Sequence, residues 1–453
     1  MNFLTGQKLV KQKQFGKALS FFLNLEKNEN QDNRIYFYLG MIYFELNNFD
    51  KSIFYYNKFL KKEPDSISTL YNLATVKQII GEVDSAKNIY LKLISLDKNK
   101  IRPYYGLFTL NENYLTNKNF EDISNIKNKQ KISVYEEGII NFILSKKEKK
   151  NKKYKKEIEY LKRFHSHIFN SNYEYNMSSQ FYYNKIIYQN YNKIKILESN
   201  FKKVNIEPIF IIGLPRSGST LVESILTSGS EKIISYGECH VINMSVLEQI
   251  GPKIYIKNFD IKNFKFEINI INLLESITKR YSKFYFENKK KNQIFIDKSL
   301  ENFFNIEIIL HIFPKAKFIH TFRNPTDSII SIYQSMLPEL SWTHTIENIL
   351  IYIDIYFKVL EYFKSKYPEK IIDINLEDLT ENSEVTTKKI YKFCNLDWTK
   401  DVLNFYKRDD LHSKTLSFNQ IKKKISKYDN LKYQPYFHLL DNYKERFRWI
   451  NIN

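Results

Sequence analysis

Hydrophobic and polar positions in the first third of the chain repeat with a period of 34 residues. Small residues at fixed places in such a repeat let two antiparallel helices approach closely, and aromatic residues fill the grooves between units. The pattern therefore predicts an array of helical hairpins over about residues 1–110. Its members are Gly6, Gly40 and Ala74; Ala18, Ser52 and Ala86; and Phe22, Tyr56 and Tyr90.

This repeat resembles the tetratricopeptide repeat in its length and in its small and aromatic positions. The segments LGMIY at 39–43 and NFDKSI at 48–53 carry the resemblance. It implies a concave helical surface that binds a partner peptide or positions a protein substrate, with a structural or dimerisation role as the alternative. Residues 111–200 stay helix-like and rich in lysine without a clear period.

The pattern changes after Glu207 and Pro208. A short apolar run at 209–212 is typical of a buried strand, and the loop Gly213–Thr220 and a helix-like apolar pattern follow it. A strand, a glycine-containing loop and the start of a helix form an arrangement in which backbone N–H groups hold a phosphate. The glycines have the spacing of a nucleotide-triphosphate P-loop, but Ser219 stands where that loop has its lysine.

Two later segments add candidate anion contacts. A strand over 317–322 is followed by Arg323 and, eight positions on, by Ser331. A guanidinium at a strand end and a hydroxyl on the next helix can converge on one phosphate dianion. A second strand over 294–296 ends in Asp297 and Lys298, and Asp297 would be a magnesium ligand if the chain were a P-loop kinase or NTPase.

The three segments together resemble the sulfotransferases that use 3′-phosphoadenosine-5′-phosphosulfate (PAPS). The similarity is strongest to the tyrosylprotein sulfotransferases and to bacterial sulfotransferases with amino-terminal tetratricopeptide repeats. It implies that Arg323 and Ser331 bind the 3′-phosphate, that Lys298 contacts the sulfuryl group and the bridging oxygen, and that no metal is needed. The residues that would bind the 5′-phosphosulfate are Arg216, Ser217, Gly218, Ser219 and Thr220.

A base must take the proton of the acceptor hydroxyl. The resemblance places it in the Gly-Glu context of residues 236–240, where Glu238 is the candidate and His240 the alternative. Tyrosylprotein sulfotransferases have a second glutamate at the position of Cys239, and an arginine at the position of Ser335. These two departures put a tyrosylprotein substrate in doubt.

The segment Thr415–Lys422 resembles the carboxy-terminal lid that covers the cofactor in this family. The resemblance places Ser417, Gln420 and Lys422 near the nucleotide. The segment 374–379 resembles a Tyr-Glu-Asp-Leu motif with leucine in place of tyrosine, and we interpret it as structural.

Composition narrows the class of protein further. The formal charge is +20, but 61 of the 70 basic residues are lysine and no recognised nucleic-acid motif is present, so we expect no nucleic-acid partner. Arg216 and Arg323 are two of only nine arginines. The two cysteines fit a reducing compartment, and neither a signal peptide nor a membrane span is expected, which predicts a cytoplasmic protein. His165 and His167 are predicted to be surface residues.

The sequence thus predicts an α-helical tetratricopeptide-repeat array followed by a P-loop-like, three-layer α/β sulfotransferase domain with a mainly parallel sheet. The expected segments are the repeat array at 1–125, a helical, lysine-rich bridge at 126–206 and the sulfotransferase domain at 207–453. The expected reaction is in-line transfer of a sulfuryl group from PAPS to a hydroxyl acceptor, which could be a protein, peptide, glycan, lipid or metabolite. The alternatives are a kinase or NTPase using Mg-ATP and a catalytically inactive repeat scaffold. The sequence does not indicate the oligomeric state.

Overall fold

The computed structural model describes residues 3–12, 14–27, 32–129, 131–197, 204, 206–230, 233–254, 264–285, 294–408 and 423–451. Contacts divide them into two compact units, and the division falls between Lys147 and Glu148. Each unit is described separately below.

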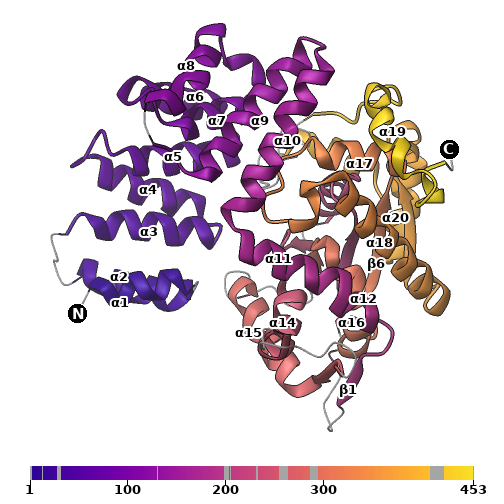
Figure 1. Ribbon diagram of the computed structural model, residues 1–453. Helices are drawn as coiled ribbons and strands as arrows, with labels where there is room; N and C mark the ends of the chain where they lie inside the picture. The colour runs from indigo at the N-terminus through magenta and orange to yellow at the C-terminus, as the bar shows by residue number, and fades with distance from the viewer. Residues whose placement is uncertain are drawn as a thin grey trace. The chain divides into compact units, whose positions relative to one another are not determined.

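The first unit is entirely helical in the part that the structure describes. Consecutive helices pack against each other, and α3, α4 and α5 lie as successive layers in Figure 1. The helices are α1 (Phe3–Lys11), α2 (Phe15–Lys27), α3 (Arg34–Glu45), α4 (Phe49–Leu60), α5 (Ile67–Ile79), α6 (Val83–Leu96), α7 (Ile101–Leu110), η1 (Glu112–Tyr114), α8 (Asn117–Lys129) and α9 (Val134–Lys150), within which the division between the units falls.

The small residues of the 34-residue period lie where helices cross. A Cβ atom added to Gly40 would lie 2.6 Å from the ring of Tyr56, and one added to Gly6 would lie 2.6 Å from the ring of Phe22. Ser52 takes the place of an alanine because its hydroxyl donates to the carbonyl oxygen of Gly40 at 2.7 Å. The predicted helical repeat is therefore confirmed.

The second unit contains a parallel five-stranded sheet in the order β3-β5-β2-β6-β7. Every residue of the central strand β2 is buried, as is usual for a parallel sheet covered by helices on both faces. This confirms the predicted α/β domain with a mainly parallel sheet. The strands are β2 (Ile209–Gly213), β3 (Ile233–Ser235), β5 (Ile294–Asp297), β6 (Lys317–Phe322) and β7 (Ile371–Asn375).

Parallel strands bring their carboxyl ends to one edge of the sheet, so the segments that follow β5, β2 and β6 meet there. A separate two-stranded sheet pairs β1 (Lys195–Leu197) with β4 (Glu267–Asn269).

The remaining helices of the second unit cover this sheet or precede it in the chain. They are α10 (Tyr154–Ser171), α11 (Tyr173–Phe181), η2 (Tyr182–Ile187), α12 (Tyr188–Asn190), α13 (Ser219–Ser228), α14 (Val241–Ile254), α15 (Ile270–Tyr285), η3 (Leu300–Asn305), α16 (Ile306–Ile312), α17 (Pro325–Tyr333), η4 (Ser341–His344), α18 (Ile346–Lys366), α19 (Leu376–Glu381), α20 (Ser383–Cys394), η5 (Lys400–Lys407), η6 (Gln434–Tyr443) and η7 (Arg448–Asn451). Helices α10 and α11 pack against η4, although they come from the segment expected to bridge the domains. The three-part division of the chain stays a prediction.

His165 is buried, so the prediction that it is a surface residue was wrong. It lies on the face of α10 that also carries Leu161 and Ile168, and both are buried. Its Nδ1 atom is 3.2 Å from Nδ1 of His344, and its Nε2 atom is 2.7 Å from the carbonyl oxygen of Tyr333. Two hydrogen-bonding partners allow the imidazole to be buried.

None of the helices in the described ranges is long and apolar enough to cross a bilayer.

Candidate active site

The loop after β2 combines three unusual backbone conformations. Gly213 has a φ of 145°, Gly218 has a φ of 87° and Arg216 has a φ of 68°. A Cβ atom at Gly213 would lie 2.3 Å from the carbonyl oxygen of Thr321, and one at Gly218 would lie 2.7 Å from Cδ1 of Leu376. Both glycines are therefore required by the close approach of neighbouring segments. Arg216 adopts the left-handed conformation without being glycine, and such strain concentrates at functional sites.

The hydroxyl of Ser217 holds this loop together. It donates to the carbonyl oxygen of Leu214 at 2.6 Å and lies 2.9 Å from Oγ1 of Thr321. Because the hydroxyl is used within the protein, Ser217 would contact a ligand through its backbone N–H group. Ser219 and Thr220 are buried and form the start of α13, where backbone N–H groups have no partner within the helix.

Arg216 and Arg323 lie close enough for their positive charges to repel each other. Burial lowers the pKa of Arg216, and the charge of Arg323 lowers it further. The two guanidiniums come from the segments that follow the adjacent strands β2 and β6. An anion between them would relieve their mutual repulsion.

The guanidinium of Arg323 is buried and only partly satisfied by the protein. One terminal nitrogen donates to the carbonyl oxygen of Asp327 at 3.0 Å and the other to the hydroxyl of Tyr428 at 3.2 Å. Its Nε atom has no hydrogen-bond partner among the described residues. The side chain therefore keeps a donor for an anion.

The turn after Arg323 is fixed by two capping contacts. The side chain of Asn324 accepts from the N–H group of Thr326 at 2.9 Å, and Glu377 accepts from the N–H group of Asn324 at 2.9 Å. Glu377 belongs to the segment interpreted as structural, and this contact agrees with that interpretation. Ser331 follows on α17 and is buried.

Lys298 is fully buried at the end of β5 and lies between two carboxylates. Its Nζ atom donates to Oε1 of Glu238 at 2.7 Å and lies 3.6 Å from Oε2 of Glu223. Burial would lower the pKa of Lys298, but the charges of Glu223 and Glu238 outweigh it and raise that pKa. Glu223 was missed by the sequence analysis. Its position four residues after Ser219, on the same helix face, was the available signal.

The two base candidates differ in charge. Nδ1 of His240 lies 2.5 Å from Oε1 of Glu301. Burial would lower the pKa of His240, but Glu301 outweighs it and raises that pKa to about 9. An imidazole that is already protonated at neutral pH cannot accept a proton. Glu238, whose side chain is 42% exposed, is the better candidate.

Asp297 is fully buried, and the protein uses both of its carboxylate oxygens. Oδ1 accepts from the N–H group of Ser299 at 2.8 Å, and Oδ2 accepts from the hydroxyl of Tyr281 at 2.7 Å. The thiol of Cys239 also donates to Oδ2, at 3.2 Å. These contacts favour a structural role for Asp297 over that of a magnesium ligand. Among the described residues, no group of three or more His, Cys, Asp or Glu side chains could hold a metal.

The predicted lid residues Ser417, Gln420 and Lys422 lie outside the described residues. Two tyrosines that the sequence analysis missed flank Arg323 instead. The ring centroid of Tyr433 lies 5.3 Å from its guanidinium carbon, and that of Tyr428 lies 5.8 Å away.

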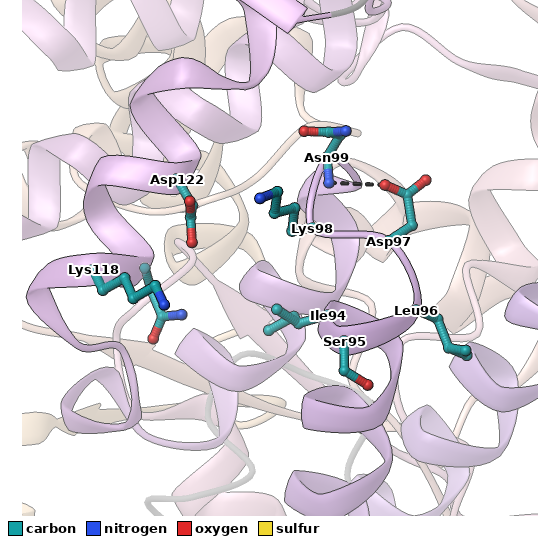
Figure 2. A pocket seen from close by; sticks show the side chains of 9 residues that line it. Ile94, Ser95, Leu96, Asp97, Lys98, Asn99, Lys118 and Asp122 are labelled. Atoms are coloured by element: carbon teal, nitrogen blue, oxygen red, sulfur yellow. Dashed lines mark hydrogen bonds between the residues drawn. The ribbon is translucent and has the colours of Figure 1, made fainter.

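A pocket of about 610 Å³ lies in the first unit, where α6 ends and α8 begins (Figure 2). None of the predicted site residues lines it, so we do not assign it to the candidate active site. Its lining residues are Ile94, Ser95, Leu96, Asp97, Lys98, Asn99, Lys118, Asn119 and Asp122.

Comparison with known proteins identifies both parts of the chain. Residues 208–400 match the sulfotransferase family, and residues 34–66 and 67–100 each match a tetratricopeptide repeat. The chain therefore carries a domain of the sulfotransferase family preceded by tetratricopeptide repeats, as the motifs predicted.

A curated relative from Aquifex aeolicus (strain VF5), described as an uncharacterized protein, is 24% identical over 433 residues. The match covers 91% of this chain and 54% of the relative, so the chain spans about half the length of that protein.

Solved structures of sulfotransferases are also similar to part of this chain. The sulfotransferase domain of the Synechococcus PCC 7002 olefin synthase is 19% identical, covering 51% of this chain and 88% of that one, with a TM-score of 0.34. The sulfotransferase domain from the curacin biosynthetic pathway is 19% identical, covering 51% and 87%, with a TM-score of 0.35. A sulfotransferase from Mycobacterium avium is 14% identical, covering 53% and 78%, with a TM-score of 0.29.

Proposed function

We propose that this protein transfers a sulfuryl group from PAPS to a hydroxyl acceptor by direct in-line displacement. The observation that carries the proposal is that three cationic residues follow neighbouring parallel strands at one edge of the sheet. Lys298, Arg216 and Arg323 follow β5, β2 and β6, which are neighbours in the sheet. A donor with an anionic group at each end matches such a site.

The residues fit the two ends of that donor. The loop 213–220 and Arg216 would hold the 5′-phosphosulfate through backbone N–H groups and one guanidinium. Arg323, with its unsatisfied Nε atom, and Ser331 would hold the 3′-phosphate and so distinguish PAPS from ATP. Lid contacts from Ser417, Gln420 and Lys422 remain part of the proposal.

The chemistry assigned to the chain requires one base and one cation. Glu238 would take the proton of the acceptor hydroxyl while the acceptor oxygen forms a bond to sulfur. The bond between sulfur and the 5′-phosphate oxygen breaks in the same step. Lys298 would stabilise the negative charge that develops on the departing 3′,5′-bisphosphate. Positioning and electrostatics suffice for this transfer, so the proposal includes no metal.

The acceptor class stays open, and the repeats favour a macromolecule. Tetratricopeptide repeats bind partner segments, so a protein, a peptide or a glycan attached to one could be held by the first unit. Cys239 and Cys394 are both free thiols, which agrees with the proposed cytoplasmic location.

A binding experiment separates this function from a kinase or NTPase. We expect 3′,5′-adenosine bisphosphate to stabilise the protein without magnesium, by about 2.7 kcal/mol at a concentration 100-fold above its Kd. Mg-ATP should give no comparable stabilisation. The opposite pattern would favour the kinase or NTPase alternative.

A turnover experiment tests the inactive-scaffold alternative. Labelled PAPS is offered with peptide, glycan, lipid and metabolite acceptors, and transfer to any of them excludes a catalytically inactive scaffold. Transfer should be abolished in Arg216→Ala and in Lys298→Ala. Unchanged turnover in both variants would remove the proposed site.

A further inference from the structure

Tyr433 lies within the candidate donor site, although it comes from the segment that follows the predicted lid. Its side chain is almost fully buried, and its ring lies 5.3 Å from the guanidinium carbon of Arg323. Its hydroxyl interacts with the side chains of Ser331 and Arg323. The phenol therefore lies beside both residues that are predicted to bind the 3′-phosphate.

We propose that the hydroxyl of Tyr433 is a third ligand of the donor's 3′-phosphate, beside Arg323 and Ser331. This inference rests on the proposed function. A buried phenol beside a guanidinium is suited to donate a hydrogen bond to a phosphate dianion that the guanidinium also binds.

Ser335 lies four residues after Ser331, just beyond the end of α17. Its hydroxyl donates to the carbonyl oxygen of Ser331 at 2.7 Å, so its proton is committed within the protein. Tyr433 supplies a donor from a different segment of the chain.

The other tyrosine beside Arg323 has a different role. The hydroxyl of Tyr428 accepts from Arg323 at 3.2 Å and donates to Oδ2 of Asp327 at 2.6 Å. Its proton is therefore committed to a carboxylate within the protein. Of the two described tyrosines beside that guanidinium, Tyr433 is the one whose side chain interacts with both Ser331 and Arg323.

A buried polar network fixes the position of Tyr433. Three residues further on, the hydroxyl of Tyr436 donates to Oε2 of the fully buried Glu157 at 2.6 Å. Gln334, which directly follows α17, donates to Oε1 of Glu157 at 3.1 Å and accepts from Lys149 at 2.6 Å. Glu157 therefore ties the segment of Tyr433 to the end of the helix that carries Ser331.

The test compares two ligands that differ in the 3′-phosphate. Affinities for 3′,5′-adenosine bisphosphate and for adenosine 5′-monophosphate are measured by calorimetry in the full chain and in Tyr433→Phe. We expect the variant to bind the bisphosphate roughly tenfold more weakly, as for the loss of a charge-assisted hydrogen bond, and the monophosphate unchanged. Folding should be kept because the ring is kept, and a melting curve without ligand checks this.

Tyr367→Phe is the matched control. It removes a partly buried hydroxyl that donates to Glu307 at 3.0 Å, outside the donor site, and should change neither affinity. Equal weakening of both ligands in Tyr433→Phe, or an unchanged preference for the bisphosphate, would overturn the inference and leave the proposed function standing. A wild-type protein with no preference for the bisphosphate would overturn the proposed function and this inference with it.

Discussion

Lys298 donates a hydrogen bond to Glu238, with 2.7 Å between Nζ and Oε1. The cation proposed to stabilise the leaving group and the proposed base are thus paired with each other. A buried lysine needs such a partner, because an isolated charge in this interior would be strongly destabilising. Glu223 gives Lys298 a second carboxylate at 3.6 Å, so the lysine can stay charged when Glu238 turns toward an acceptor.

Glu238→Gln should lower kcat by roughly 100- to 10,000-fold, because an amide cannot accept the acceptor's proton. The Kd for 3′,5′-adenosine bisphosphate should change little. Steady-state kinetics with labelled PAPS and calorimetry measure the two effects.

Glu223→Gln is the matched variant, since it removes the other carboxylate beside Lys298. It should lower kcat much less, because Glu238 still pairs with the lysine. Equal losses in the two variants would mean that both carboxylates only position Lys298. A loss confined to His240→Gln would transfer the role of base to the imidazole.

Gly40→Ala should destabilise the repeat domain by roughly 1–3 kcal/mol, because the new methyl group would lie 2.6 Å from the ring of Tyr56. Gly16→Ala is the control within the same unit. Nothing lies within 4 Å of a Cβ atom there, so alanine should stabilise its helix by up to about 1 kcal/mol. Urea denaturation followed by circular dichroism measures both changes. Equal effects of the two substitutions would contradict the close helix crossing at Gly40.

The repeat array and the sheet edge could be predicted because their signals are local in the sequence. The contact between Gly40 and Tyr56 recurs with a fixed period, and each helical hairpin is built from neighbouring residues. The sequence was enough to predict that Arg216 and Arg323 lie at the same edge of the sheet, because each follows a strand of a parallel sheet.

Other contacts could not be predicted, because they depend on how distant segments pack. Tyr433 meets Arg323 across more than 100 residues of chain, and the sequence around it carries no phosphate-binding signal. Glu223 on α13 and Lys298 after β5 meet across 75 residues of chain, so their contact depends on how these two segments pack. His165 can be buried because its ring nitrogens lie within hydrogen-bonding distance of His344 and of the carbonyl oxygen of Tyr333. The sequence of α10 alone gives no sign of these two partners.

Asp297→Asn should destabilise the protein by roughly 1–3 kcal/mol without creating or removing any dependence on magnesium. The amide nitrogen cannot accept the bonds that one carboxylate oxygen now accepts, so a buried donor from Tyr281, Cys239 or Ser299 loses its partner. Urea denaturation gives the stability, and turnover with and without EDTA gives the metal dependence. A variant of normal stability that has lost a magnesium-dependent activity would instead support the Mg-ATP alternative.

The ion pair of His240 and Glu301 should make stability depend on pH. The pKa of His240 is about 9 in the folded protein and 6.5 for the ordinary side chain. The contribution of the ion pair to the free energy of unfolding is therefore fully present below pH 6.5 and is lost as the pH rises from 6.5 to 9.

The pair is partly exposed, with 44% of the histidine side chain accessible, so solvent screening should hold its contribution under about 1 kcal/mol. His240→Gln removes the titration, and urea denaturation of both proteins at pH 6 and pH 9 measures the difference. The free energy of unfolding of the wild type should exceed that of the variant, and this excess should be larger at pH 6 than at pH 9. Adding 1 M salt should reduce the excess. An excess that is the same at both pH values would mean that the pKa of His240 is not raised in the folded protein, which would restore it as a base candidate.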